Sequence, residues 1–216
     1  MMRRPVLSAI VVLNMALPAL ADDRREPYEI ALAFRKSQDE SAFGVDGEDG
    51  ARAKLFREFA EAVSLAPRSS WERLRNRQAI VWYLLAGGSP EAVRDIVLRL
   101  KLSSSERALM EGALASANGR DVDARLLLNT VDARSLPSCL GAIVALAQAR
   151  SAQDITQKMR FLNVARLLNP GSLVEEAALR QEILVAADAR DYARFTSLAQ
   201  RYFVRFPKSV FAKAFG

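Results

Sequence analysis

Histidine is absent from the 216-residue chain, and cysteine occurs once, at Cys139. The lack of histidine excludes a Ser/His/Asp triad, a Cys/His pair and any histidine-ligated zinc site. A single cysteine excludes an internal disulfide, and its place at the start of an apolar run predicts a small buried thiol. Phosphate-binding glycine motifs and the G-x-S-x-G and S-x-x-K motifs are also missing. The sequence therefore predicts a protein that is not an enzyme and has no cofactor, metal or small-molecule substrate.

Long hydrophobic runs are missing except at the N-terminus, where Val6 to Ala21 form a mainly apolar stretch. Two arginines precede the stretch, and it ends in Ala-Leu-Ala before Asp22. This pattern is typical of a secretory signal peptide, so residues 1–21 are predicted to be removed by cleavage between Ala21 and Asp22. The alternative is a retained anchor, but a spanning helix needs about 20 apolar residues. We expect a periplasmic protein with no stable membrane span after processing.

Charge of one sign is not concentrated anywhere in the chain. The net charge is +6, and loss of residues 1–21 lowers it to +4. The densest basic stretch, which is interrupted by Glu72, comprises Arg68, Arg73, Arg75 and Arg77. A nucleic-acid site is one interpretation of such a stretch, but export favours the solvated face of a helix. No nucleic-acid partner is predicted.

Apolar residues recur at helical spacing along nearly the whole mature chain. The predicted helices cover residues 27–40, 51–66, 71–86, 91–102, 105–117, 121–131, 137–150, 154–168, 172–188 and 191–205, with a short one from Ser209. Residues 22–50 are thus expected to form an N-terminal helix and an acidic, glycine-rich loop at 43–50. The loop is not a calcium site, because Arg57 stands where such a loop requires a glutamate. Residues 51–216 are expected to form one α-helical repeat domain.

A repeated pattern of aspartate and proline indicates the architecture. The three aspartates expected to begin helices are each followed 16 residues later by a proline, in the pairs Asp121–Pro137, Asp154–Pro170 and Asp191–Pro207. Successive pairs are 33 and 37 residues apart. Helix pairs of about 34 residues that end in Ala-x-x-Leu-x-Pro look like tetratricopeptide repeats. We therefore predict an all-α fold that is a helical-hairpin, tetratricopeptide-like solenoid, with a closed bundle as the alternative.

Two groups of residues have both a structural and a functional interpretation. Trp71, Trp82 and Tyr83 lie close together in the sequence, and packing in the core is favoured over a surface anchor. Glu175 and Glu176 are adjacent, so they point about 100° apart on a helix and cannot face each other as an acid/base pair. Their place in a first turn instead suits the helix dipole.

Two stretches, 165–180 and 203–212, resemble the periplasmic motility protein C family of rhizobial flagellar motors, and weaker similarity extends back to about Ala79. The resemblance implies a role in chemotaxis and motility. It implies binding to the periplasmic part of the flagellar stator protein B and tuning of motor speed. Members of the family continue well beyond the position of Gly216, so the resemblance also implies a short or truncated member.

The predicted helix at 172–188 is the most polar helix in this region and the first of its hairpin. First helices line the concave face of a tetratricopeptide-like stack, so partner contacts are predicted at Glu175, Glu176, Arg180 and Glu182. Some of these side chains are expected to be exposed. Charge reversal at an exposed Glu176 or Arg180 would then change stability by about 0.5 kcal/mol or less.

Two other functions remain open on the sequence. One is a generic periplasmic helical-repeat scaffold for envelope or peptidoglycan assembly. The other is a muramidase with a helical body, which needs a glutamic acid in a cleft with its pKa raised by burial.

Overall fold

The computed structural model describes residues 25–42, 49–209 and 211–212. In these ranges all regular structure is helical, which confirms the all-α prediction. The elements are α1 (Pro27–Ala42), α2 (Asp49–Leu65), η1 (Arg68–Glu72), α3 (Leu74–Leu85), α4 (Glu91–Arg99), α5 (Ser104–Ala117), α6 (Asp121–Leu128), η2 (Ala133–Ser135), α7 (Ser138–Ser151), α8 (Ile155–Leu168), α9 (Leu173–Asp188) and α10 (Tyr192–Arg205), where η marks a 3-10 helix.

Some predictions fall outside the described residues. These are the signal peptide at 1–21 with its cleavage point between Ala21 and Asp22, residues 43–48 of the predicted loop, and most of the short helix from Ser209. Within the described ranges, no helix is both long enough and apolar enough to cross a membrane.

Side-chain caps fix the start of three helices in the C-terminal half. Asp154, Ser172 and Asp191 each accept a hydrogen bond from the backbone N–H three residues ahead, at 2.7, 3.2 and 3.0 Å. Such caps satisfy backbone donors that have no partner inside the helix. Asp121 differs, because it is the first residue of α6 and the preceding Arg120 provides no side-chain cap.

The predicted continuous helix over residues 71–86 is wrong, because a short 3-10 helix precedes α3 and the chain is extended between them. Side chains of α3 bind the carbonyl groups that this break leaves free. The Asn76 amide donates to the Ser70 carbonyl at 2.9 Å, and the Arg77 guanidinium donates to the Trp71 carbonyl at 2.8 Å. Helix α3 therefore begins at Leu74, after Arg73, and not at Trp71.

The predicted helix at 121–131 also ends early, at Leu128. At this end the side-chain amide of Gln148 in α7 donates to the carbonyl groups of Leu128 and Val131 at 2.7 and 2.9 Å. Gln148 is 2% exposed, so this side chain replaces helical hydrogen bonds inside the core.

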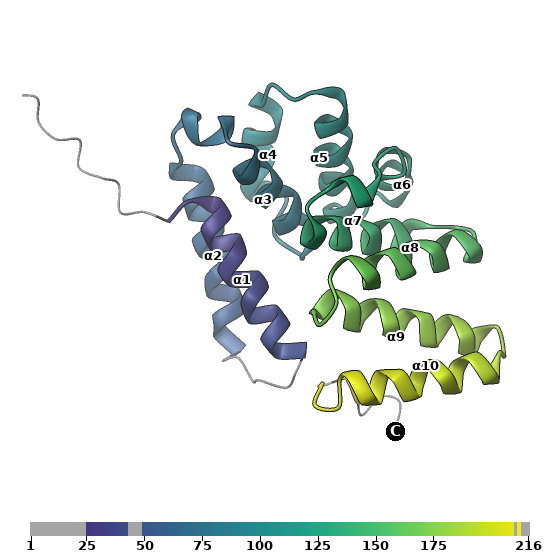
Figure 1. Ribbon diagram of the computed structural model, residues 1–216. Helices are drawn as coiled ribbons and strands as arrows, with labels where there is room; N and C mark the ends of the chain where they lie inside the picture. Colours follow the sequence, from purple (N-terminus) through teal and green to yellow (C-terminus); the bar gives the residue numbers. More distant parts are fainter. Residues whose placement is uncertain (1–24, 43–48, 210, 213–216) are drawn as a thin grey trace, which may run out of the picture.

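Helices that follow one another in sequence pack together in the pairs α1–α2, α5–α6, α7–α8, α8–α9 and α9–α10. Figure 1 shows α8, α9 and α10 in successive layers. Distant helices also meet, since α1 contacts α3 and α9. A carboxylate oxygen of Asp39 accepts a hydrogen bond from the backbone N–H of Leu173 at 3.0 Å, which joins the end of α1 to the start of α9. A solenoid requires only contacts between adjacent repeats, so the tetratricopeptide-like arrangement stays a prediction.

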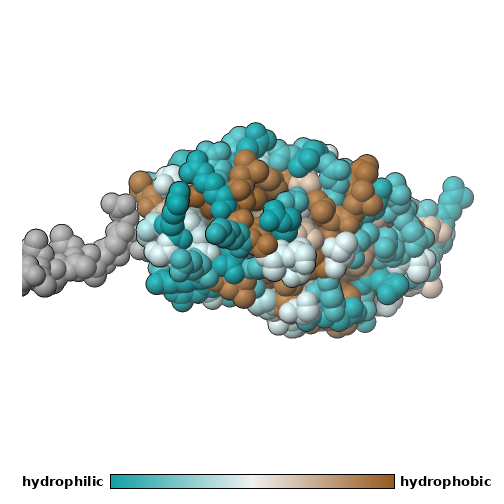
Figure 2. Space-filling model, turned by 90° about the horizontal axis from the view of Figure 1, so that it is seen from above, coloured by the Kyte–Doolittle hydropathy of each residue, from teal (hydrophilic) through white to brown (hydrophobic). Residues whose placement is uncertain are grey.

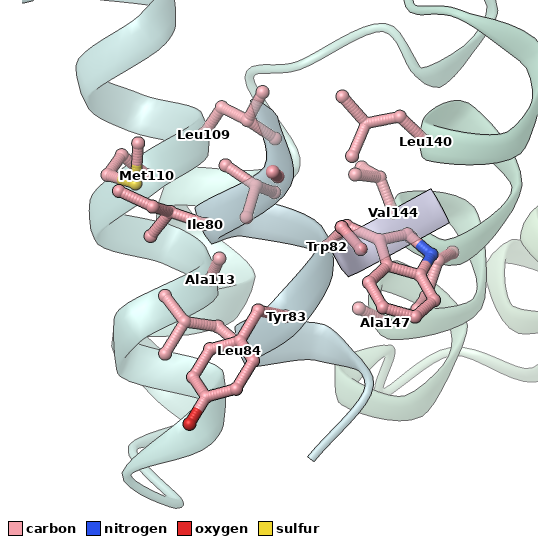
Figure 3. Packing of buried hydrophobic residues seen from close by; sticks show 14 of the residues in the cluster. Ile80, Trp82, Tyr83, Leu84, Leu109, Met110, Ala113, Leu140, Val144 and Ala147 are labelled. Carbon is pink, nitrogen blue, oxygen red and sulfur yellow. The ribbon is translucent and has the colours of Figure 1, made fainter. Parts of the chain in front are cut away.

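The largest hydrophobic cluster surrounds α3. Figure 3 shows Ile80 of α3 next to Met110 of α5, while Trp82 lies beside Val144 and Ala147 of α7. Trp71, Trp82 and Tyr83 are 6%, 7% and 3% exposed, so the prediction that all three are packed is confirmed. In this way α3 holds the N-terminal helices against the C-terminal ones.

The thiol of Cys139 was predicted to be buried, but Cys139 is half-buried. Its side chain lines two small cavities of about 160 and 190 Å³ beneath α1, both of which Arg35 and Trp82 also line. The outer surface is mixed in character. Figure 2 shows hydrophobic patches separated by hydrophilic side chains on the face seen from above.

Gly141 lies where α7 passes close to η2. A Cβ atom at this position would overlap the carbonyl oxygen of Ala133 and lie 3.0 Å from Cδ1 of Leu168. Ala133 is 4% exposed, so its backbone is held inside the core. Because glycine has no side chain, α7 and η2 can approach each other closely at Gly141.

We expect Gly141→Ala to lower the free energy of unfolding by about 1–3 kcal/mol, because it overfills a packed contact. Urea unfolding followed by circular dichroism measures the change. The control is Gly50→Ala in α2, where a Cβ meets nothing within 4 Å and alanine is the better helix former by up to about 1 kcal/mol. Equal stability of Gly141→Ala and the unsubstituted protein would contradict the close approach.

Candidate functional site

The predicted partner-binding residues lie on α9, and local structure fixes where this helix begins. Gly171, in the turn before the helix, has a φ of +78°, a conformation that favours glycine. Ser172 follows as the N-cap residue and binds the backbone N–H of Glu175. Glu175 and Glu176 therefore occupy the first turn, where the helix dipole stabilises negative charge.

Glu176 is the centre of a buried hydrogen-bond network and is 0% exposed. Its Oε1 atom accepts hydrogen bonds from the Tyr202 hydroxyl at 2.5 Å and the Ser209 hydroxyl at 3.0 Å. Its Oε2 atom accepts from Nε of Arg180 at 3.0 Å. A buried carboxylate is tolerated only when it is paired and hydrogen-bonded. These contacts join α9 to α10 and to the segment after it.

Arg180 extends the same network toward the surface. Its guanidinium carbon lies 3.8 Å from the centre of the Phe211 ring, within the range of a cation–π contact. The side chain of Arg180 is 27% exposed. One arginine therefore pairs with the buried Glu176 and covers the ring that follows α10.

Tyr202 donates its hydroxyl proton to Glu176, and its ring is buried in the cluster formed by α9 and α10. Burial, followed in importance by this hydrogen bond, raises the pKa of Tyr202 to about 12. The contact between the phenol and Glu176 therefore depends on a protonated tyrosine.

Glu175 and Glu182 are paired with arginines of the neighbouring helices. Glu175 is 8% exposed, and its Oε2 atom lies 3.3 Å from Nε of Arg205 in α10. Glu182 is 3% exposed, and its Oε2 atom lies 3.6 Å from Nε of Arg166 in α8. Burial raises the pKa of Glu182 above its ordinary value, and the positive charges of Arg166, Arg194 and Arg201 oppose the increase.

Some of these four side chains were expected to be exposed, but Glu175, Glu176 and Glu182 are buried and Arg180 is half-buried. Helices α8 and α10 both pack against α9, and α1 and α7 contact it as well. The first three turns of α9 are therefore enclosed, and only Arg180 among the predicted residues is half-buried. A charge reversal at Glu176 would disrupt the interior, contrary to the expected change of about 0.5 kcal/mol or less.

The arginines around these glutamates were not predicted as a site. We define the arginine face as Arg166 of α8 with Arg194, Arg201 and Arg205 of α10. The three arginines of α10 are separated by seven and four residues, a spacing that places them on one side of a helix. That spacing was visible in the sequence, whereas the contribution of Arg166 depends on the packing of α8 against α9.

The carboxylates of the three glutamates of α9 pair with arginine, tyrosine and serine side chains. Across the described ranges, no group of three or more His, Cys, Asp or Glu residues is arranged to hold a metal ion. What the arrangement offers at the surface is a set of guanidinium groups, which recognise carboxylates and other anions.

The family model described as "Chemotaxis protein MotC" matches residues 1–216, the whole chain. The chain belongs to the MotC family. It is 26% identical over 212 residues to the chemotaxis protein MotC of Rhizobium meliloti strain 1021. The comparison covers 97% of this chain, and the chain spans about half the length of that relative, 48%. The resemblance drawn from residues 165–180 and 203–212 is thus confirmed. No solved structure matches this MotC-family chain.

We expect Glu176→Ala to lower the free energy of unfolding of the MotC-family chain by about 3–5 kcal/mol. The substitution leaves Tyr202, Ser209 and Arg180 without their shared acceptor, and breaking a buried pair has a cost of this size. Glu61→Ala is the control, because Glu61 is an exposed residue of α2 and its loss should change stability by about 0.5 kcal/mol or less. Equal effects of the two variants in urea unfolding would contradict the network.

Tyr202 should also make stability depend on alkaline pH. Its folded pKa of about 12 exceeds the ordinary value of 10, so its contribution is fully present below pH 10 and is lost as pH rises toward 12. Tyr202→Phe should be about 1–3 kcal/mol less stable at pH 8, because the carboxylate loses a donor. The difference from the unsubstituted protein should shrink at pH 11.5 in chemical unfolding. A difference that stays constant with pH would argue against this role of the phenol.

Proposed function

We propose that this chain is a periplasmic, non-catalytic adaptor of the flagellar motor. In this proposal it binds the periplasmic part of the stator protein B and tunes motor rotation and speed during motility and chemotaxis. The observation that carries the proposal is the match of the MotC family over the whole chain. The name of the family supports a role in chemotaxis and motility, and stator binding is our more specific proposal.

The burial and pairing of Glu182 favour a binding function over the alternative of a muramidase. Glu182 has one property of a muramidase acid, since burial raises its pKa. It is nevertheless 3% exposed and faces Arg166. A general acid must reach the bond that it protonates, so this geometry does not support the muramidase function.

The periplasmic location rests on the export pattern of residues 1–21, with cleavage expected between Ala21 and Asp22. A protein that meets the stator outside the cytoplasm has to be exported, so the two parts of the proposal depend on each other. Mass spectrometry of the secreted protein would identify Asp22 as the first residue if the pattern is a signal peptide.

The predicted contact residues take a modified role in this proposal. Glu175, Glu176 and Glu182 position arginines instead of contacting a partner themselves, and Arg180 is the predicted residue that remains partly accessible. In a helical-hairpin stack, α8, α9 and α10 would present these arginines as one lateral surface.

The test is a binding measurement between the purified chain and the purified periplasmic domain of stator protein B. We expect capture of the stator domain in surface plasmon resonance, and slower swimming of cells that lack the chain. The same chain denatured by heat, with its loss of helix verified by circular dichroism, should lose capture and serves as the control for binding that depends on the fold. A folded chain that does not bind the stator domain would favour the alternative of a general scaffold for envelope or peptidoglycan assembly.

A further inference from the structure

Helix α10 has an unbalanced distribution of charge. Between Tyr192 and Arg205 it contains three arginines and no acidic residue. Arg194, Arg201 and Arg205 are all exposed. At 100° per residue they fall within about 40° of one another, and they extend over about 16 Å of the helix. The apolar side, with Leu198, Ala199 and Tyr202, is buried against α9.

The carboxylates beneath the arginine face neutralise only part of its charge. Glu175 pairs with Arg205, and Glu182 pairs with Arg166. Arg194 and Arg201 act on Glu182 electrostatically, but within the described part of the chain neither forms an ion pair closer than 4 Å. Three exposed guanidinium groups and the half-buried one of Arg166 therefore lie over two buried carboxylates, which leaves an excess of two positive charges on this side of the helix stack.

We propose that the arginine face is a docking surface for an acidic segment of a protein partner. The inference rests on the proposed function only for the identity of that partner. Guanidinium groups bind carboxylates with paired, directional hydrogen bonds, which gives geometric specificity as well as attraction. A partner with acidic residues spaced along a helix or an extended strand would meet Arg194, Arg201 and Arg205 in turn.

The distribution of apolar residues favours a protein segment over a lipid surface. A helix that lies on a membrane places its apolar side into the bilayer and carries its basic residues beside it. The apolar side of α10 is already occupied by α9, since Leu198 and Tyr202 are 9% and 0% exposed. The apolar side chains that α10 does expose, Tyr192, Phe203 and Val204, lie about 80° or more around the helix from the middle of the arginine stripe at 100° per residue. The side of α10 that the arginines occupy therefore exposes no large apolar side chain for insertion.

The test measures binding of a fluorescent dodecaglutamate peptide to the full chain by fluorescence anisotropy at low salt. The double variant Arg194→Gln/Arg201→Gln should weaken binding about fivefold or more, since it removes the two unpaired arginines. Both side chains are exposed, so the melting temperature should stay within about 2 °C. Raising the salt concentration from 50 to 200 mM should weaken binding of the unsubstituted chain.

Two further variants control for net charge. Arg57→Gln/Arg99→Gln removes the same number of exposed arginines from α2 and α4, and it should leave peptide binding nearly unchanged. Glu182→Gln removes a carboxylate from beneath the face and should strengthen binding. Equal losses in the two double variants would overturn the proposal, because binding would then follow total charge rather than this surface.

Vesicle binding distinguishes a protein segment from a lipid as the ligand of the arginine face. Stator capture distinguishes the docking surface from the proposed function. Preferential, arginine-dependent binding to vesicles of phosphatidylglycerol and phosphatidylcholine would overturn the proposal in favour of a lipid. Stator capture that is unaffected by Arg194→Gln/Arg201→Gln would also overturn it and leave the proposed function intact. Arginine-dependent peptide binding without stator capture would instead support the docking surface and contradict the proposed partner.

Discussion

The carboxylate of Glu176 has no contact with water, yet three parts of the chain depend on it. It receives hydrogen bonds from α9 itself, from Tyr202 of α10 and from Ser209 after α10. Removing a charge from water is costly, so the fold can retain this group only while all its donors stay in place. The position of α10 against α9, and with it the position of the arginine face, therefore depends on one buried acid.

The three glutamates of α9 are buried, whereas the three arginines of α10 are exposed. Glu175 and Glu182 pair with arginines of the flanking helices, of which Arg205 is exposed and Arg166 is half-buried. An alternating distribution over one surface would neutralise itself. On this side of the stack Glu175 and Glu182 are enclosed, so solvent and any partner meet the exposed arginines of α10. This separation links the stability of the helix stack to the binding proposed for its surface.

The N-terminal part of the chain is joined to this stack at two places. Asp39 binds the backbone at the start of α9, and Ala42 packs in the cluster of Leu179 and Tyr202. Helix α3 supplies the second connection, because its buried aromatic side chains contact both α1 and α7. The distant ends of the described chain thus share contacts, and α9 is enclosed more completely than it would be in an open row of hairpins.

The sequence by itself determined that the fold is helical and where most helices lie. Apolar residues at helical spacing and aspartates at helix starts, such as Asp154 and Asp191, act over a few residues, so their effect can be read locally. The resemblance of residues 165–180 and 203–212 also identified the MotC family. Tertiary structure alone decided that Gln148 of α7 binds the carbonyl groups at the end of α6, because Gln148 is 17 to 20 residues away from them in the sequence. The break at η1 is bound by Asn76 and Arg77, which lie six residues further along the chain, but no spacing pattern in the sequence marks them. Tertiary structure also decided that Glu176 is buried. A glutamate in a first turn suits both an exposed and an enclosed helix, and only the packing of α8, α10 and α1 around α9 distinguishes them.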